Sequence, residues 1–379
     1  MKAEYTIGAV VGGFVLAGLA YLYSVPSPTL PIQQDTRISS ATTSTILGAE
    51  TSSTFAAKQK KATPKGIPYT EIMNPSGFVN IDSITLKELI GKKVIIVDFL
   101  TYSCINCQRT FPYLNAWYEK YKNQGLEIIG IHTPEFAFEK DIGNVREAMK
   151  KFDITHPIVL DNNYATWNAY GNRYWPRKYI IDIYGNVVYD HIGEGGYEET
   201  EMKIRELLAE RAEVLGMGTS DMDKTLAVST VPQGTNVAKS PETYFGSLRN
   251  SYLANGIPGR LGEQTFLLPQ DFASDTLYLN GTWNITLEYA ESASDASVVY
   301  RYNAKEVYIV ADANTPVVVE VLQDGKMVGM SAGADVNADG VVMMKESRLY
   351  TLIHNPEPGE HVLELKIKGK VRLYAFTFG

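Results

Sequence analysis

The chain has 379 residues, of which 45% are hydrophobic and 21% charged, so it is long enough for two folded domains and has the composition of a globular protein. A formal net charge of -8 argues against binding along a phosphate backbone, which requires clustered Lys and Arg, and we expect no nucleic-acid partner. The two cysteines, Cys104 and Cys107, are too few for a disulfide framework or a structural zinc site. They are predicted to form a CxxC dithiol.

The amino-terminal segment predicts a membrane anchor. Residues 7–23 carry no charge, and a run of roughly 17 apolar residues is the lower limit for a spanning helix. No convincing small-residue cleavage site follows, so we expect residues 1–24 to be an uncleaved signal anchor, with a cleaved signal peptide as the alternative. Both readings place the rest of the chain outside the cytoplasm, in the periplasm or at the cell surface.

Residues 25–67 are predicted to form a flexible linker. They are rich in Ser, Thr, Ala and Pro and lack a sustained apolar period, which is typical of a tether. Such a tether keeps the next domain close to membrane partners and raises their effective concentration.

The first folded domain is predicted over residues 68–216, and its early elements lead to the dithiol. A short helix signal at TLKELIG precedes a buried-strand signal at VIIVDFL, and a helical pattern of apolar and aromatic residues then runs towards Gly125. Cys104 falls where the strand gives way to the helix, and the free N–H groups and dipole of a helix start favour a thiolate. Cys107 lies one turn further on, within reach to resolve a mixed disulfide formed by Cys104.

The rest of this domain alternates between strand and helix signals. Strands are expected in GLEIIGIHTPEF, in ITHPIVLDN and on both sides of a turn at YGN, and helices are expected at DIGNVREAMKKF and YATWNAYG. In the last helix, YEETEMKIRELLAERAEVLG, four apolar residues are predicted to lie on one face: Met202, Ile204, Leu207 and Leu208. The alternation indicates an α/β domain.

The segment VDFLTYSCINC resembles the strand, loop and helix around the dithiol of thioredoxins. The resemblance implies a thioredoxin-like domain with a central mixed sheet flanked by helices. It also implies a redox-active disulfide, Cys104–Cys107, with no further cofactor. By the same resemblance Asp98 is a buried acid that helps to move the proton of Cys107, whereas a solvated Asp at the strand end is the alternative reading.

The resemblance also predicts where a substrate docks. Thioredoxin-like folds place a cis-proline beside the dithiol, and Pro176 stands at the start of the corresponding strand. The Trp175–Pro176 bond is therefore expected to be cis, and the backbone of Trp175 to pair with an extended substrate. Substrate contacts are also expected at three residues next to the cysteines: Tyr102, Ile105 and Asn106.

Longer motifs narrow the resemblance to the redoxin branch. HTPEF is similar to an insertion in the membrane-anchored TlpA/ResA-type thioredoxins of cytochrome c maturation, in which Glu135 matches an acidic residue near the dithiol; the alternative is a surface carboxylate. SCINC, HTPEFAFEK and DNNYATWNAYGNRYWP resemble the extracytoplasmic part of DipZ-type proteins. The implied substrates are exported proteins with disulfides or thiols, and the implied reductant is a separate membrane electron-transfer protein of the CcdA/DsbD kind.

Two other chemistries stay open at this point. His132 with the cysteine pair is reminiscent of copper chaperones with a redoxin fold, although those space the two cysteines one residue wider. Thr101 precedes Cys104 by three positions as in thiol peroxidases, but the companion proline is absent. We favour neither, and no metal site is predicted.

After a hinge at 217–240, residues 241–379 show short alternating runs that predict a β-sandwich. The segment resembles the carboxyl-terminal jelly roll of DipZ-type proteins, which is similar to carbohydrate-binding modules, so a glycan or another cell-surface ligand is a candidate partner. The competing function is a binding protein that acts through this domain. Four aromatic residues could form a binding platform, but a core position is favoured for them: Trp283, Tyr300, Tyr302 and Tyr350.

A pattern in the second domain matches the calcium loop of EF-hands. Asp335, Asn337, Asp339, Gly340 and Glu346 have the required spacing. An EF-hand needs flanking helices, whereas strands are predicted on both sides, so a turn at Asp339–Gly340 is favoured and calcium binding is left open.

Overall fold

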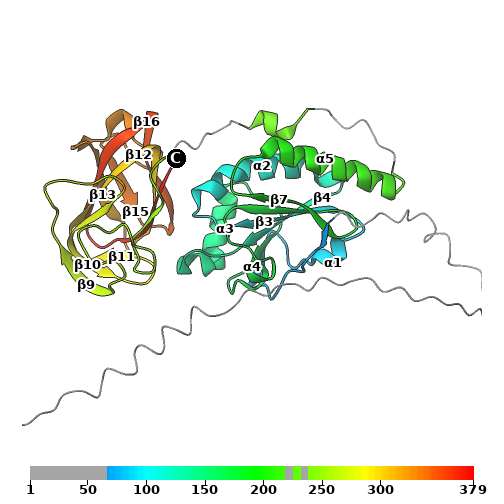
Figure 1. Ribbon diagram of the computed structural model, residues 1–379, viewed down its shortest axis with the longest axis horizontal. Helices are drawn as coiled ribbons and strands as arrows, with labels where there is room; N and C mark the ends of the chain where they lie inside the picture. The colour runs from blue at the N-terminus through cyan, green and yellow to red at the C-terminus, as the bar shows by residue number, and fades with distance from the viewer. Residues whose placement is uncertain (1–65, 218–224, 232–237) are drawn as a thin grey trace, which may run out of the picture. The chain divides into compact units, whose positions relative to one another are not determined.

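The computed structural model describes residues 66–217, 225–231 and 238–379. These residues all belong to one compact unit. They form an α/β domain followed by an all-β domain, and Figure 1 labels the elements of both. The predicted anchor at 1–24 and most of the predicted linker lie outside the described residues.

The α/β domain is built on a mixed sheet. Its seven strands, counted within the described residues, are ordered β1-β7-β6-β3-β4-β5-β2, with β3, β4 and β5 parallel and the other pairs antiparallel. The strands are β1 (Ile67–Pro68), β2 (Gly77–Val79), β3 (Val94–Leu100), β4 (Leu126–His132), β5 (Ile158–Leu160), β6 (Arg177–Ile181) and β7 (Asn186–Ile192). The sheet thus begins one residue before the predicted domain start.

Helices cover both faces of this sheet (Figure 1). They are α1 (Leu86–Leu89), α2 (Ile105–Tyr121), α3 (Ile142–Lys151), α4 (Ala165–Ala169) and α5 (Tyr197–Val214), with 3-10 turns η1 (Lys122–Gln124), η2 (Ala137–Lys140) and η3 (Ala227–Thr230). Side chains alternate along a strand. Ile96 and Leu100 of β3 therefore pack towards α2, α3 and α5, and Val97 and Phe99 pack towards α1 and α4.

The predicted strands and helices of this domain are confirmed. The predicted position of Met202 on the buried face of α5 is wrong. Ile204, Leu207 and Leu208 of α5 are buried, but Met202 is 57% exposed. Successive residues are rotated by about 100° around a helix, so Met202 lies about 200° from Ile204, on the opposite face.

The second domain, called here the β domain, consists of antiparallel strands. Among the described residues, ten strands join in one sheet in which β12 pairs with β10, β16 and β17. They are β8 (Thr243–Tyr244), β9 (Gly262–Phe266), β10 (Leu277–Ile285), β11 (Ala290–Ser292), β12 (Ala296–Asp312), β13 (Val317–Gln323), β14 (Lys326–Met327), β15 (Val341–Met344), β16 (Arg348–Lys368) and β17 (Arg372–Phe378), with a 3-10 turn η4 (Gly329–Ser331). The all-β prediction is confirmed, whereas the jelly-roll arrangement stays a prediction.

The four aromatic residues considered for a platform lie in the core of the β domain. Trp283, Tyr300, Tyr302 and Tyr350 are each at most 1% exposed and belong to one apolar cluster. Their hydroxyl and indole groups find partners inside the domain, as in the 2.9 Å contact between the hydroxyls of Tyr300 and Thr243. The core interpretation is therefore confirmed, and the platform reading is wrong.

The EF-hand-like segment folds as a turn between strands. The backbone N–H groups of Asp339 and Val341 donate to Oδ1 of Asn337, and Gly340 has a φ of 77°. Asp335 is paired with Arg348 at 2.9 Å and accepts from the N–H of Thr351. Its carboxylate is therefore committed to the fold of the β domain.

No helix in the described part of the chain has the length and apolar character needed to cross a membrane. The predicted membrane anchor falls in residues 1–24, which are not described.

Candidate active site

The dithiol lies where β3 passes into α2. Cys104 occupies the N-cap position of α2, with extended backbone angles, and its carbonyl accepts the N–H of Gln108 at 3.0 Å. Cys104 is half-buried and Cys107 is fully buried, and neither is in a disulfide. Because the first N–H groups of a helix have no partner within the helix, they face the Cys104 end of the pair. The predicted junction is confirmed.

A buried carboxylate fixes the loop in front of Cys104. Oε1 of Glu139, from η2, accepts from the hydroxyls of Thr101 and Ser103, the latter at 2.6 Å. Its Oε2 accepts from the backbone N–H groups of Glu135 and Phe136. Burial raises the pKa of Glu139, and the Ser103 and Thr101 hydrogen bonds oppose that shift. Glu139 thus ties the dithiol loop to the loop that carries Glu135.

We expect Glu139→Gln to weaken this connection. A Gln amide nitrogen cannot accept hydrogen bonds, so some of the buried hydroxyl or N–H donors would lose their partner, at a cost of about 1–3 kcal/mol in the free energy of unfolding. Urea denaturation of the full chain measures this loss. Glu147→Gln, at an exposed helix position, is the matched control. An equal effect in both variants would contradict the connection of the two loops through Glu139.

An acid and a base lie buried behind Cys107. Asp98 and Lys178 are both 0% exposed and face each other across β3 and β6 in antiparallel register. Asp98 shares the α2-facing side of β3 with Ile96 and Leu100. Neither Asp98 carboxylate oxygen has a hydrogen-bond partner among the described residues. The Lys178 ammonium contacts the carbonyl of Gly193 at 3.4 Å.

The charges of Asp98, Lys178 and Cys107 influence one another's pKa values. Burial raises the pKa of Asp98 to about 7, although the Lys178 charge acts in the opposite direction. Burial lowers the pKa of Lys178, and the charges of Asp98 and Cys107 oppose that shift. Burial also raises the pKa of the Cys107 thiol, as do its hydrogen bond with Cys104 and the nearby Asp98. Burial thus disfavours the thiolate form of Cys107.

The predicted docking edge starts with a cis peptide bond between Trp175 and Pro176, as expected. Pro176 is buried, and its carbonyl accepts the N–H of Gly193 at 2.8 Å. The Trp175 indole packs against Trp167 of α4, with ring centroids 4.3 Å apart. The indole therefore rests on the α/β domain, and Trp175 also lines the cavity that contains Cys104.

The other predicted substrate contacts differ in exposure. Asn106 is half-buried and lines the same cavity as Cys104 and Trp175, a space of about 410 Å³. Tyr102 is 3% exposed and donates its hydroxyl to the carbonyl of Ser347 at 3.0 Å. Ile105 is 6% exposed and packs against the β domain. Tyr102 and Ile105 are thus covered by the β domain.

Glu135 also lines the cavity at Cys104. Its Oε1 accepts from Nη1 of Arg249 at 2.7 Å and lies 2.9 Å from the hydroxyl of Tyr244. Both partners come from the β domain. The Glu135 side chain is only 10% exposed, so it is not a free surface carboxylate.

His132 lies at the end of β4 and is fully buried. Burial lowers its pKa to about 3, and its ring stacks on Tyr102 with centroids 5.7 Å apart. Within residues 66–217, 225–231 and 238–379, no three His, Cys, Asp or Glu side chains are grouped so that they could hold a metal ion.

Three features of this site were missed from sequence. Lys178 carried a signal, since a charged residue stands inside the apolar strand that follows Pro176, but nothing local identified Asp98 as its partner. Glu139 and its donors are 36 and 38 residues apart, so no periodicity connects them. Tyr244 and Arg249 belong to another domain, and no local pattern brings them to Cys104.

Family profiles match both domains. A profile described as Redoxin matches residues 76–208, and one described as thioredoxin-like C-terminal domain matches residues 240–379. The thiol-disulfide oxidoreductase YkuV of Bacillus subtilis is 30% identical over 38% of this chain and 95% of its own length. The thiol-disulfide oxidoreductase ResA of Bacillus thuringiensis is 31% identical over 40% of this chain and 83% of its own length.

The similarity to Protein DipZ of Mycobacterium tuberculosis extends over both domains. It amounts to 37% identity over 316 residues, or 83% of this chain. This chain spans 42% of the length of that protein.

Proposed function

Since this chain belongs to the thiol-disulfide oxidoreductases of the redoxin family, we propose that Cys104 and Cys107 are its reacting pair and that it reduces or exchanges disulfides in exported proteins. The observation that carries the proposal is the contrast between the two sulfurs at one helix start. Cys104 lines a cavity, whereas Cys107 is buried one turn behind it. An accessible nucleophile with a protected resolving thiol is what two-step exchange requires.

The reaction begins with attack of the Cys104 thiolate on one sulfur of a substrate disulfide. The other substrate sulfur leaves as a thiolate and takes up a proton, and a mixed disulfide joins Cys104 to the substrate. Cys107 then loses its proton and attacks Sγ of Cys104, which releases the second substrate thiolate. Two electrons have passed to the substrate, and the protein holds a Cys104–Cys107 disulfide until a reductant restores the dithiol.

In this scheme Asp98 accepts the Cys107 proton, directly or through a water. A carboxylate with a pKa of about 7 is matched to proton transfer near neutral pH. Lys178, as its register partner, favours the ionised form that can accept the proton. Glu135 is the second candidate for proton transfer, because it lines the cavity at Cys104.

Substrate recognition is assigned to the edge at Trp175 and Pro176, with Asn106 at the same cavity. An extended segment would pair with the backbone of Trp175 and place its disulfide against Cys104. Tyr102 and Ile105, covered by the β domain, would support the loop from behind.

The cellular setting is part of the same proposal. An anchor at residues 1–24 would tether the catalytic domain outside the cytoplasm, supported by the uncharged apolar run at 7–23. A separate membrane electron-transfer protein of the CcdA/DsbD kind would return electrons to the dithiol, and cytochrome c maturation is one pathway that needs such reduction.

Equilibration of the full chain with glutathione buffers tests the redox chemistry. We expect one transition, in which mass spectrometry shows the loss of both free thiols together, because formation of an intramolecular disulfide transfers two electrons. The Cys107→Ser variant should instead carry one glutathione, on Cys104. Separate oxidation of Cys104 and Cys107 in the parental chain would contradict the proposal.

A further inference from the structure

The β domain packs directly on the dithiol loop. Ile105, which follows Cys104, is buried in an apolar cluster with Tyr308 and Val310 of β12 and with Leu349 of β16. An apolar residue between the two cysteines would otherwise be an exposed contact for any incoming protein. Here the β domain occupies that side of the dithiol.

Polar contacts fix this arrangement on several sides of the loop. Nη2 of Arg109, from α2, lies 3.0 Å from Oε2 of Glu306 in β12. The Tyr102 hydroxyl reaches the carbonyl of Ser347, and the N–H of Ala137 donates to Glu288 at 2.9 Å. Several of the charged partners are partly shielded from solvent, so these contacts are less weakened by water than exposed surface pairs are.

The space left beside Cys104 has walls from both domains. Trp175 and Asn106 of the α/β domain form one side, and Tyr244 and Arg249 of the β domain form the other. A cavity of about 410 Å³ falls at the small end of the range for ligand pockets. A small molecule or a short extended segment would fit into this cavity better than the flat surface of a folded protein would.

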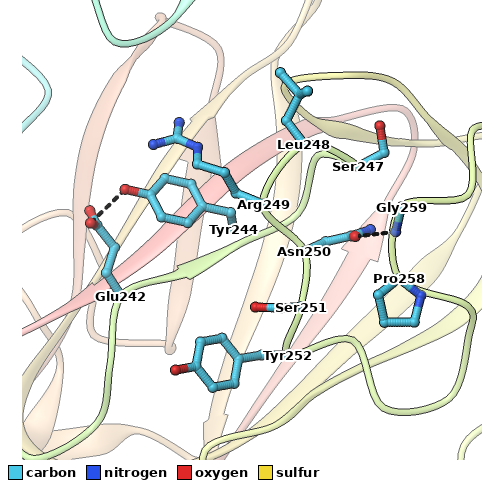
Figure 2. A pocket seen from close by; sticks show the side chains of 10 residues that line it. All are labelled: Glu242, Tyr244, Ser247, Leu248, Arg249, Asn250, Ser251, Tyr252, Pro258 and Gly259. Atoms are coloured by element: carbon cyan, nitrogen blue, oxygen red, sulfur yellow. Dashed lines mark hydrogen bonds between the residues drawn. The ribbon is translucent and has the colours of Figure 1, made fainter. Parts of the chain in front are cut away.

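Tyr244 and Arg249 are held by contacts with each other and with both domains. The Arg249 guanidinium stacks 3.6 Å above the Tyr244 ring and pairs with Glu135. Figure 2 shows Glu242, Tyr244 and Arg249 close together, with the hydrogen bond from Tyr244 to Glu242 drawn. Tyr252 lies in the same view and lines a neighbouring pocket, but not the one that contains Cys104.

We propose that the β domain forms part of the substrate site, and that Tyr244 and Arg249 select disulfides carried on a segment no wider than one extended chain. Small disulfides and flexible peptide loops share this property, whereas a disulfide on the face of a folded domain lacks it. The inference rests on the proposed exchange at Cys104 and specifies its substrate class. Both side chains contact substrate in this scheme, and they act on binding without taking part in electron transfer.

Three symmetrical disulfides test the selection with the full chain: oxidised glutathione, the dimer of a short linear peptide, and the dimer of a small folded domain joined through a cysteine on its sheet face. Each is mixed with the reduced chain, which supplies the two electrons for a single turnover. We expect the second-order rate constant for the peptide dimer to exceed that for the folded dimer by about tenfold or more, the lower end of what pocket shape achieves. The Tyr244→Ala and Arg249→Gln variants should each reduce this ratio, mainly through weaker binding of the peptide dimer. Tyr252→Ala is the matched control and should leave the ratio unchanged.

The outcomes distinguish a failure of disulfide exchange at Cys104 from a failure of substrate selection by the β domain. If the parental chain reduces none of the three disulfides, the proposed function fails. If it reduces the folded and peptide dimers equally well, or if both wall variants behave like Tyr252→Ala, the dithiol works without selection by the β domain and this inference is overturned. Two wall variants are used so that misfolding of one, seen by its denaturation curve, still leaves a decisive result.

Discussion

Replacing Cys104 by Ser is expected to abolish disulfide exchange, because a hydroxyl cannot replace the thiolate as nucleophile or carry the electrons. The loss in the turnover rate of a peptide disulfide should reach roughly 10³-fold or more, as for other enzymes that lose their nucleophile. Cys107 is not expected to take over, since it is fully buried and burial raises the pKa of its thiol.

The partner variant should behave differently. Cys107→Ser removes the resolving thiol but leaves the first attack, so a single turnover should stop at the mixed disulfide. Thiol release followed by stopped flow distinguishes the two variants. Equal loss of the first burst in both would mean that the two cysteines have no separate roles.

Replacing Asp98 by Asn should slow resolution of the mixed disulfide while largely preserving the first attack. Asn keeps the shape of Asp but cannot accept a proton. General base catalysis contributes roughly 10²-fold to 10⁴-fold when the geometry is good, and less when a water relays the proton. Asp82→Asn, at an exposed position, is the control for the change of charge.

The pH dependence of this step follows from the pKa of Asp98. Only the ionised carboxylate accepts a proton, so the parental resolution rate should rise with pH through about 7 and then level off. The Asn variant should lack that rise. The rates are compared from about pH 6 to about pH 8, that is, from below to above the Asp98 pKa. If the Asn variant resolves mixed disulfides at the parental rate over this range, Asp98 is structural. Glu135 then becomes the next candidate for proton transfer.

Local sequence patterns predicted the part of the site that lies close together along the chain. The run VIIVDFL and the helix start at Cys104 follow from periodicity and helix-start signals over about ten residues. The places of Asp98 and Pro176 in the site were implied by the resemblance to thioredoxins. The prediction for Met202 is wrong because it rests on the apolar character of the residue and does not consider its angular position around the helix.

Contacts between distant segments could not be predicted in this way. Glu139 reaches Thr101 across 38 residues, and Tyr244 reaches Glu135 across 109. The first pair depends on how η2 packs against the dithiol loop, and the second on how β8 packs against the loop that carries Glu135. Local periodicity encodes neither contact. The aromatic residues of the β domain were ambiguous for the same reason, until their burial decided between core and surface.

The most direct test of the central claim is to trap the mixed disulfide. The full-length Cys107→Ser variant is incubated with a peptide disulfide, quenched in acid and digested, and the peptide adduct is located by mass spectrometry. We predict one adduct, on Cys104, and none when Cys104 is replaced by Ser and Cys107 is kept. An adduct of equal yield on Cys107 in that second variant would contradict the assignment of Cys104 as the attacking thiol.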